Sequence, residues 1–203
     1  ASVVTFCAIL FLSPRLRGAI KGGVFYIGYR LYTSRYLGFY LHTRELNSEA
    51  NKAYVPHSER KVVKLPSTAS SPKGIDIVVL AMLSDNYSYL VVDRTTRTAC
   101  AVDPCQPSVL LQELKRYGNL KLTHLLITHR HWDHAGGIFD LLKEFPYLQV
   151  VGPAADGVPC LTLPVKDSST FNVGTMSFEV YHTPCHTQGH VVYLCNKRAM
   201  FTG

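Results

Sequence analysis

Short apolar runs recur from residue 75 to the end of the chain, and many are rich in β-branched and aromatic residues. Runs of this length, bounded by polar residues, Gly or Pro, predict β-strands. The expected strands are residues 75–80, 89–93, 98–103, 125–127, 148–152, 176–181, 191–195 and 199–202. Helical patterns at 107–117 and 137–145 lie between them. Because strands and helices alternate and no internal repeat is present, we predict a layered α/β sandwich.

The first residues follow a different pattern, with an apolar run at residues 3–12 and Arg15, Arg17 and Lys21 directly after it. About ten apolar residues are too few to cross a bilayer, which needs ~20. A signal-peptide core and a core helix are alternatives, but no small-residue cleavage site follows. We therefore expect residues 1–12 to be the remnant of a membrane anchor. Its basic flank would keep the rest of the chain membrane-associated on the cytoplasmic side.

Residues 13–64 are basic and carry aromatic residues at three- and four-residue steps between positions 25 and 40. This spacing places one aromatic stripe on a helix and predicts a membrane-proximal, interfacial helical segment. Ile27 and Leu31 lie off the stripe, so a helix that packs on the domain or on a partner is the alternative. The sequence of residues 65–74, LPSTASSPKG, is typical of a linker. We place the domain boundary near residue 73 and the domain at 75–203.

Composition narrows the choice of partners. A hydrophobic content of 47% supports a real core, and the net charge of +7 comes from the first 64 residues, with ten Lys/Arg against three Asp/Glu. Residues 65–203 hold eleven of each sign. A neutral catalytic part argues against a nucleic-acid enzyme and favours a membrane as the partner of the basic segment. Six cysteines without C-x-x-C spacing indicate free thiols in a reducing compartment.

The candidate chemistry lies in residues 128–137, THRHWDHAGG, directly after the expected strand at 125–127. At strand-like spacing His129 and His131 point the same way and can reach one metal ion. Asp133 and His134 follow where the chain turns, so the segment can serve two ions. Imidazole and carboxylate ligands suit zinc, iron or manganese. A histidine-rich surface loop is the alternative, but four ligand-type residues at this spacing rarely coincide without a metal.

Three ordered motifs, 83–89 (LSDNYSY), 128–134 (THRHWDH) and 183–190 (TPCHTQGH), resemble those of the metallo-β-lactamase superfamily, and the last resembles its glyoxalase II branch. The resemblance implies an αββα sandwich, of which this chain holds the N-terminal part. It also implies two metal ions, expected to be zinc with iron or manganese possible. The implied ligands are His129, His131 and His186 for the first ion, and Asp133 and His134 for the second.

We expect two further residues, Asp103 and His190, to support the ligands without binding an ion, Asp103 by the same resemblance. Asp103 closes a strand and would orient a metal-bound histidine. His190 ends its motif, and we expect Gly189 and the following strand to turn it away from the ions. In the family a bridging aspartate and a last histidine complete the site after the segment that here is residues 201–203. We therefore expect the 203-residue chain to be an incomplete, inactive domain that binds one ion.

Two neighbouring ions can activate water at neutral pH and polarise the carbonyl group that it attacks. Apart from the ligand set, no residue stands out as a general acid, and a thiolate, with a thiol pKa of ~8.5, leaves without one. We therefore expect a glyoxalase II-type hydrolase acting on an acyl-glutathione such as S-lactoylglutathione. The alternatives are a sulfur (persulfide) dioxygenase with one iron held by two histidines and a carboxylate, and a membrane-tethered interaction protein that keeps a metal-stabilised fold.

Overall fold

The computed structural model describes residues 23, 24, 26, 27, 30, 31, 37, 40, 56 and 58–203. The chain divides into two compact units, Ala1–Leu41 and His42–Gly203. The described residues of the first unit are helical, and no helix in the described part of the chain is long and apolar enough to span a bilayer. The predicted anchor at 1–12 and most of the aromatic stripe lie outside the described residues. Membrane association therefore stays a prediction.

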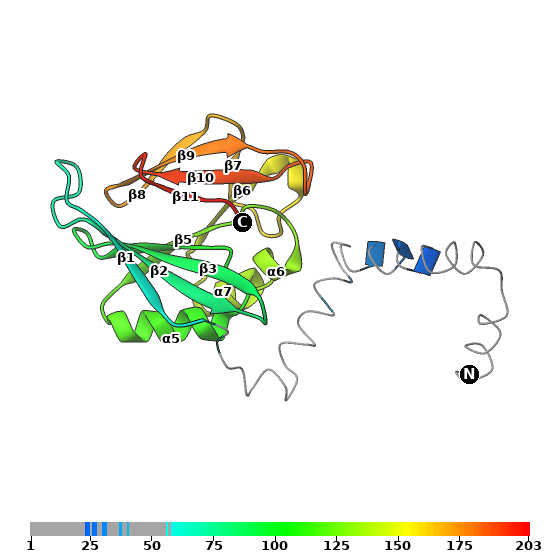
Figure 1. Cartoon of the computed structure of the whole chain (residues 1–203), viewed down its shortest axis with the longest axis horizontal. Coiled ribbons are helices and arrows are strands. Elements are labelled where there is room, and N and C mark those ends of the chain that lie inside the picture. The colour runs from blue at the N-terminus through cyan, green and yellow to red at the C-terminus, as the bar shows by residue number, and fades with distance from the viewer. Residues whose placement is uncertain are drawn as a thin grey trace. The chain divides into compact units, whose positions relative to one another are not determined.

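Seven strands form the larger sheet, and their order in space follows their order in the sequence (Figure 1). The first four pair antiparallel, and the last four, starting from the shared fourth strand, pair parallel. They are β1 (Lys61–Leu65), β2 (Ile75–Met82), β3 (Asn86–Asp93), β4 (Thr98–Val102), β5 (Lys121–Leu126), β6 (Gln149–Pro153) and β7 (Leu163–Val165). The parallel part has carboxyl ends that meet at one edge of the sheet, where functional groups gather in open α/β sheets.

Helices connect the parallel strands, as a parallel pairing requires. Helix α5 (Pro107–Tyr117) joins β4 to β5, while α6 (Trp132–Ala135) and α7 (Ile138–Glu144) join β5 to β6. Pro107 suits the first turn of α5, and Gly118, with φ 54°, ends the helix where a side chain would be strained. Leu110, Ile138 and Leu141 are fully buried. In Figure 1, α5 and α7 lie on the side of the larger sheet away from the second sheet.

The second sheet contains four antiparallel strands in the order β11-β10-β9-β8. They are β8 (Thr170–Val173), β9 (Met176–His182), β10 (Val191–Cys195) and β11 (Ala199–Phe201). The main core lies between the two sheets and includes Val91, Leu126, Phe178 and Tyr193, each with no exposed surface. The Tyr193 hydroxyl donates a hydrogen bond to the carbonyl oxygen of Ile127 at 2.8 Å and so ties β10 to the end of β5.

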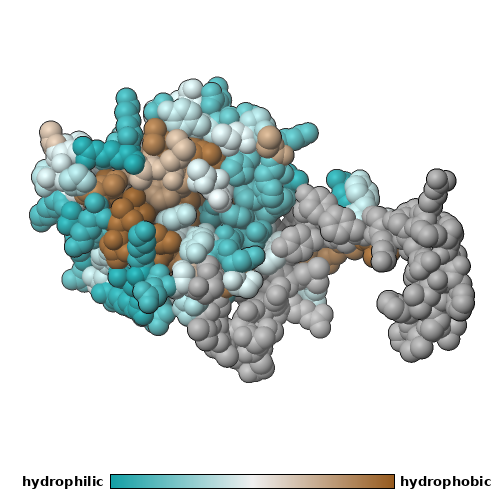
Figure 2. All heavy atoms as spheres, viewed as in Figure 1, coloured by the Kyte–Doolittle hydropathy of each residue, from teal (hydrophilic) through white to brown (hydrophobic). Residues whose placement is uncertain are grey.

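The surface of the domain carries both hydrophilic and hydrophobic residues. Figure 2 shows a hydrophobic area within the domain face that it presents, surrounded by hydrophilic residues. The exposed large hydrophobic side chains in 58–203 are Val63, Tyr87, Phe139, Tyr147, Tyr181 and Met200. Within residues 58–203, no two cysteines form a disulfide bond.

The sheet begins earlier than the sequence suggested. Strand β1 lies in the segment assigned to the juxtamembrane region, and residues 66–74 join β1 to β2 within one sheet rather than linking two domains. This connection is held by its own hydrogen bonds, including one from the N–H of Ser71 to the Thr68 hydroxyl oxygen at 3.0 Å. The linker prediction was wrong because a Pro- and Ser-rich composition is typical of any loop, whether it joins strands or domains.

Asp93 ties the two sheets together. Its side chain accepts hydrogen bonds from the N–H and hydroxyl of Thr175, at 2.7 and 2.8 Å, and from the Thr96 hydroxyl at 2.6 Å. Burial acts to raise the pKa of Asp93, but the hydrogen bonds from Thr96 and Thr175 outweigh it, so the pKa is lowered. Because Asp93 is fully buried, removing its carboxylate leaves these donors without a partner.

Asp93→Ala is expected to lower the free energy of unfolding by about 2–4 kcal/mol, since hydrogen bonds to a charged group are lost. A lowered pKa means that the native state binds its proton less readily than the unfolded chain. The stabilisation is therefore complete above about pH 4, the ordinary Asp pKa, and is lost as pH falls through the folded pKa. Urea unfolding of wild type and Asp93→Ala across this range measures the difference. A difference that does not shrink in acid would contradict the prediction.

Candidate metal centre

The carboxyl ends of three neighbouring parallel strands bring together polar residues that are far apart in the sequence. Asp103 follows β4, the 128–134 motif follows β5, and Asp156 follows β6. A loop from the smaller sheet, residues 183–190 between β9 and β10, supplies His186 and His190. A pocket of about 510 Å³ lies here, and its lining includes His129, His134, Cys185, His186 and His190.

Three of the predicted ligands form one cluster. One possible ligand atom from each of His129, His131 and His186 lies within 4.8 Å of the other two. Nδ1 of His131 is 3.0 Å from Nε2 of His186. His129 is 1% exposed, and its Nε2 is buried without a hydrogen-bond partner. A buried imidazole nitrogen with no partner, beside two converging imidazoles, is what a metal site would explain.

The electrostatics of the cluster favour neutral imidazoles, the form that binds metals. Burial, together with the neighbouring histidines, lowers the pKa of His129 far below its ordinary value. Burial and His186 also lower the pKa of His131, although Asp133 partly opposes them. Both rings are therefore uncharged at neutral pH. Imidazole nitrogens from three histidines suit a zinc ion with an open coordination position.

The other two predicted ligands lie next to this cluster. Asp133 and His134 are on α6, and Oδ2 of Asp133 is 3.5 Å from Nε2 of His134. The His134 ring is 4.2 Å from the His129 ring between centroids. Asn86 donates a hydrogen bond to the Asp133 carbonyl oxygen, so the first predicted motif, in the β2–β3 hairpin, supports α6. A carboxylate and an imidazole in this position provide donors for a second ion beside the first.

Asp103 contacts two residues of the 128–134 motif, the predicted ligand His134 and Thr128, which precedes His129. Its Oδ2 is 2.9 Å from Nδ1 of His134 and accepts a hydrogen bond from the Thr128 hydroxyl at 2.7 Å. The same hydroxyl is 3.0 Å from Nδ1 of His129. Burial acts to lower the pKa of His134, but Asp103 and Asp133 raise it to about 10. Asp103 thus orients His134 directly and His129 through Thr128.

His190 lies where the sequence did not place it. We expected the following strand to turn it away, but it lines the pocket, and its ring is 5.0 Å from the His129 ring between centroids. Its Nδ1 is 2.9 Å from the Thr183 hydroxyl. Gly189, the residue before it, packs closely against Asp156. His190 lies outside the three-histidine cluster, consistent with a supporting role.

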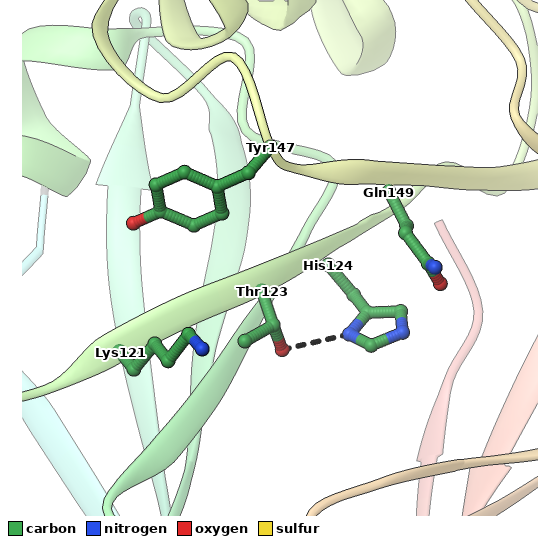
Figure 3. Close-up of a pocket in the computed structure, with 5 residues that line it drawn as sticks. All are labelled: Lys121, Thr123, His124, Tyr147 and Gln149. Atoms are coloured by element: carbon green, nitrogen blue, oxygen red, sulfur yellow. Dashed lines mark hydrogen bonds between the residues drawn. The ribbon is translucent and has the colours of Figure 1, made fainter.

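A second pocket, of about 530 Å³, lies beside the Lys121 end of β5 and the start of β6 (Figure 3). It is lined by Lys121, Thr123, His124, Tyr147 and Gln149. Nδ1 of His124 is 2.7 Å from the Thr123 hydroxyl, and burial lowers the His124 pKa, partly opposed by Gln149. With a single histidine and no carboxylate in its lining, this pocket lacks a metal-binding donor set. We therefore assign the chemistry to the histidine cluster, although its pocket is slightly smaller.

The model of the Metallo-beta-lactamase superfamily matches residues 85–203, more than half of the chain. The chain belongs to this superfamily. The fold prediction is therefore confirmed, with helices, the seven-stranded sheet and the four-stranded sheet stacked in the expected order. Within residues 170–203 the structure describes no helix on the outer face of the smaller sheet.

Similarity extends to enzymes and to solved structures. The chain is 37% identical over 127 residues to cytoplasmic hydroxyacylglutathione hydrolase of Arabidopsis thaliana; the match covers 60% of this chain and 49% of that protein. It thus spans about half the length of this relative. ETHE1 from Myxococcus xanthus is 30% identical with a TM-score of 0.54, covering 70% of this chain and 56% of that one. A metallo-beta-lactamase from Staphylococcus aureus, 21% identical with a TM-score of 0.52, covers 71% and 43% and shows the fold alone.

Proposed function

We propose that the protein is a metal-dependent hydrolase that cleaves the thioester of an acyl-glutathione. The observation that carries the proposal is the presence of two adjacent donor groups. Three histidine side chains converge on one point, and Asp133 and His134 lie beside them. The first ion would be held by His129, His131 and His186. Asp133 and His134 would hold the second ion beside it.

When two ions are bound a few Å apart, they supply an activated water and a Lewis acid for the carbonyl group. The chain itself orients the donors. Asp103 and Thr128 orient the imidazole rings of His134 and His129. Asn86 holds the backbone of Asp133. The substrate class is supported by the similarity to hydroxyacylglutathione hydrolase. It is also supported by the leaving group, since a thiolate departs without a proton donor.

The second candidate is a persulfide dioxygenase with one iron, held by two histidines and a carboxylate. The similarity to ETHE1, at 30% identity, supports this branch as much as the hydrolase relative supports the first. The two candidates differ in metal, in co-substrate and in the bond broken. A hydrolase adds water to the thioester carbonyl, whereas a dioxygenase consumes oxygen.

The test is turnover by the full-length, metal-loaded protein. We expect hydrolysis of S-D-lactoylglutathione or another acyl-glutathione, measured by release of the free thiol, with no oxygen uptake. A His186→Ala variant serves as the inactive control. Oxygen consumption with one iron per chain, and no thioester cleavage across a panel of acyl-glutathiones, would reject the hydrolase in favour of the dioxygenase.

A related prediction concerns Asp103, which contacts His134 but would not touch an ion. Asp103→Asn is expected to weaken binding of the second ion by about 10- to 100-fold, the usual effect of removing a partner of a metal ligand. The first ion should be affected less, because His131 and His186 have no contact with Asp103 among the hydrogen bonds of the described residues. Zinc titration monitored by calorimetry separates the two affinities. Equal weakening of both sites would contradict a specific role in orienting His134.

A further inference from the structure

Asp156 is a buried aspartate outside every motif of the sequence, and it lies between the two loops that supply the histidines. It follows β6 at the end of the short helix η1 (Ala154–Asp156) and its side chain has no exposed surface. Its Oδ2 accepts a hydrogen bond from the backbone N–H of Arg130 at 2.7 Å. Its Oδ1 accepts one from the backbone N–H of Gly189 at 3.2 Å. One carboxylate thus joins the two loops.

Both contacts of Asp156 lie close in sequence to predicted metal ligands. Arg130 lies between His129 and His131, and Gly189 lies three residues after His186. His131 and His186 are 55 residues apart in the sequence. Asp156 therefore contacts the backbone of each ligand-bearing loop within three residues of a histidine. In the described part of the chain, these contacts bridge the loops through a side chain that is not itself a candidate ligand.

The Arg130 side chain strengthens the same contact. Its Nη1 donates a hydrogen bond to Oδ1 of Asp156 at 3.1 Å, while the guanidinium remains partly exposed. The carboxylate thus receives three N–H donors, and its charge is paired. A buried carboxylate is tolerated in a protein when it is paired and hydrogen-bonded in this way.

Gly189 fits against the backbone of Asp156 in a manner that no other residue permits. A Cβ on Gly189 would lie 2.6 Å from Cβ, 2.7 Å from the backbone N and 2.9 Å from Cα of Asp156. These separations are far below van der Waals contact, and two of the atoms belong to the backbone. The 183–190 loop can therefore approach Asp156 closely only because residue 189 is glycine.

We propose that Asp156 is a positioning residue for the metal centre, fixing the separation of the two histidine loops before metal binds. The inference rests on the proposed assignment of His129, His131 and His186 as ligands of one ion. Asp156 acts through the backbone of the loops and does not touch the metal. A centre assembled from two separate segments loses affinity when the segments must be ordered at the moment of binding, so a fixed separation favours metal capture.

The test uses cobalt as the metal, because its visible absorption reports coordination geometry without any turnover. Asp156→Asn removes the charge and one of the two acceptor oxygens. Cobalt titration of the 203-residue chain is expected to show about 10- to 100-fold weaker binding and an altered visible spectrum. Gly189→Ala disturbs the same junction by steric clash with the carboxylate intact, and should change affinity and spectrum in the same direction. It provides the test if Asp156→Asn does not fold.

The matched control is Asp93→Asn. Asp93 is also fully buried and accepts hydrogen bonds from N–H and hydroxyl groups, but at the turns joining the two sheets rather than at the centre. The Asp93→Asn variant should be less stable than wild type but keep the wild-type cobalt affinity and spectrum. Wild-type cobalt binding by both Asp156→Asn and Gly189→Ala would overturn the proposal, and so would an equal loss in Asp93→Asn. Unchanged binding in His186→Ala would instead overturn the ligand assignment on which the proposal rests.

Discussion

His186→Ala is expected to abolish tight metal binding at the three-histidine cluster and, with it, thioester turnover by the full-length protein. Loss of a ligand should weaken zinc binding by more than about 100-fold, because removing even a partner of a ligand costs 10- to 100-fold. The fold should persist, since the His186 side chain is exposed on a loop and contributes no core packing. Equilibrium dialysis against zinc, followed by elemental analysis, measures the loss.

His124→Ala is the matched control for this experiment. His124 is a histidine on β5 that lines the separate pocket of Figure 3 and contacts Thr123 rather than the cluster. Its removal should leave the zinc content unchanged. Wild-type zinc affinity in His186→Ala, or equal losses in the two variants, would show that the cluster does not hold the metal.

Phe178→Ala is expected to lower the free energy of unfolding by about 3–5 kcal/mol, the usual cost of removing a buried aromatic side chain. Phe178 has no exposed surface, lies in the core between the sheets and stacks on Phe171 with ring centroids 5.2 Å apart. The loss includes the transfer of the ring from water and the cavity that remains. Urea unfolding followed by circular dichroism measures it.

Tyr181→Ala on the same strand is the control for Phe178→Ala. Tyr181 is 38% exposed on the outer face of β9, so its truncation should change the free energy of unfolding by less than about 1 kcal/mol. Equal losses for the two variants would contradict the placement of the core between the two sheets. A loss of less than ~1 kcal/mol in Phe178→Ala would do the same.

Most elements of the domain could be predicted because their patterns are locally unambiguous. The run IDIVVL at residues 75–80 is buried on both faces in β2, and a long apolar run predicts such a strand without tertiary information. Helix α5 carries its own start and end signals in Pro107 and Gly118. The observed bounds, Pro107–Tyr117, agree with the predicted helix.

The missed elements lack such signals. Strand β1 has the sequence KVVKL and lies at the edge of the sheet, where most of its side chains stay exposed or half-exposed. Its two lysines give it the composition of a surface segment, and charged edge strands of this kind avoid unwanted pairing. Strands β7 and β8 contain three and four residues. Segments so short acquire their strand conformation from their neighbours in the sheet, which the sequence does not display.

The candidate site likewise contains residues that the sequence predicts and one that it does not. His129, His131, Asp133 and His134 lie within six residues, so their spacing alone indicates a shared site. Asp156 could not be found from sequence, because it ends a three-residue helix between Pro153 and Gly157 and acquires its role only where three strand ends meet the 183–190 loop. A lone aspartate before a glycine is typical of a turn.

The central claim is that two metal ions lie side by side at this junction, and anomalous X-ray diffraction from crystals of the zinc-loaded full-length protein tests it most directly. We predict one anomalous peak among Nε2 of His129, Nδ1 of His131 and Nε2 of His186. We predict a second peak beside Oδ2 of Asp133 and Nε2 of His134, within about 4 Å of the first. A single peak, or zinc bound away from these five side chains, would contradict the account.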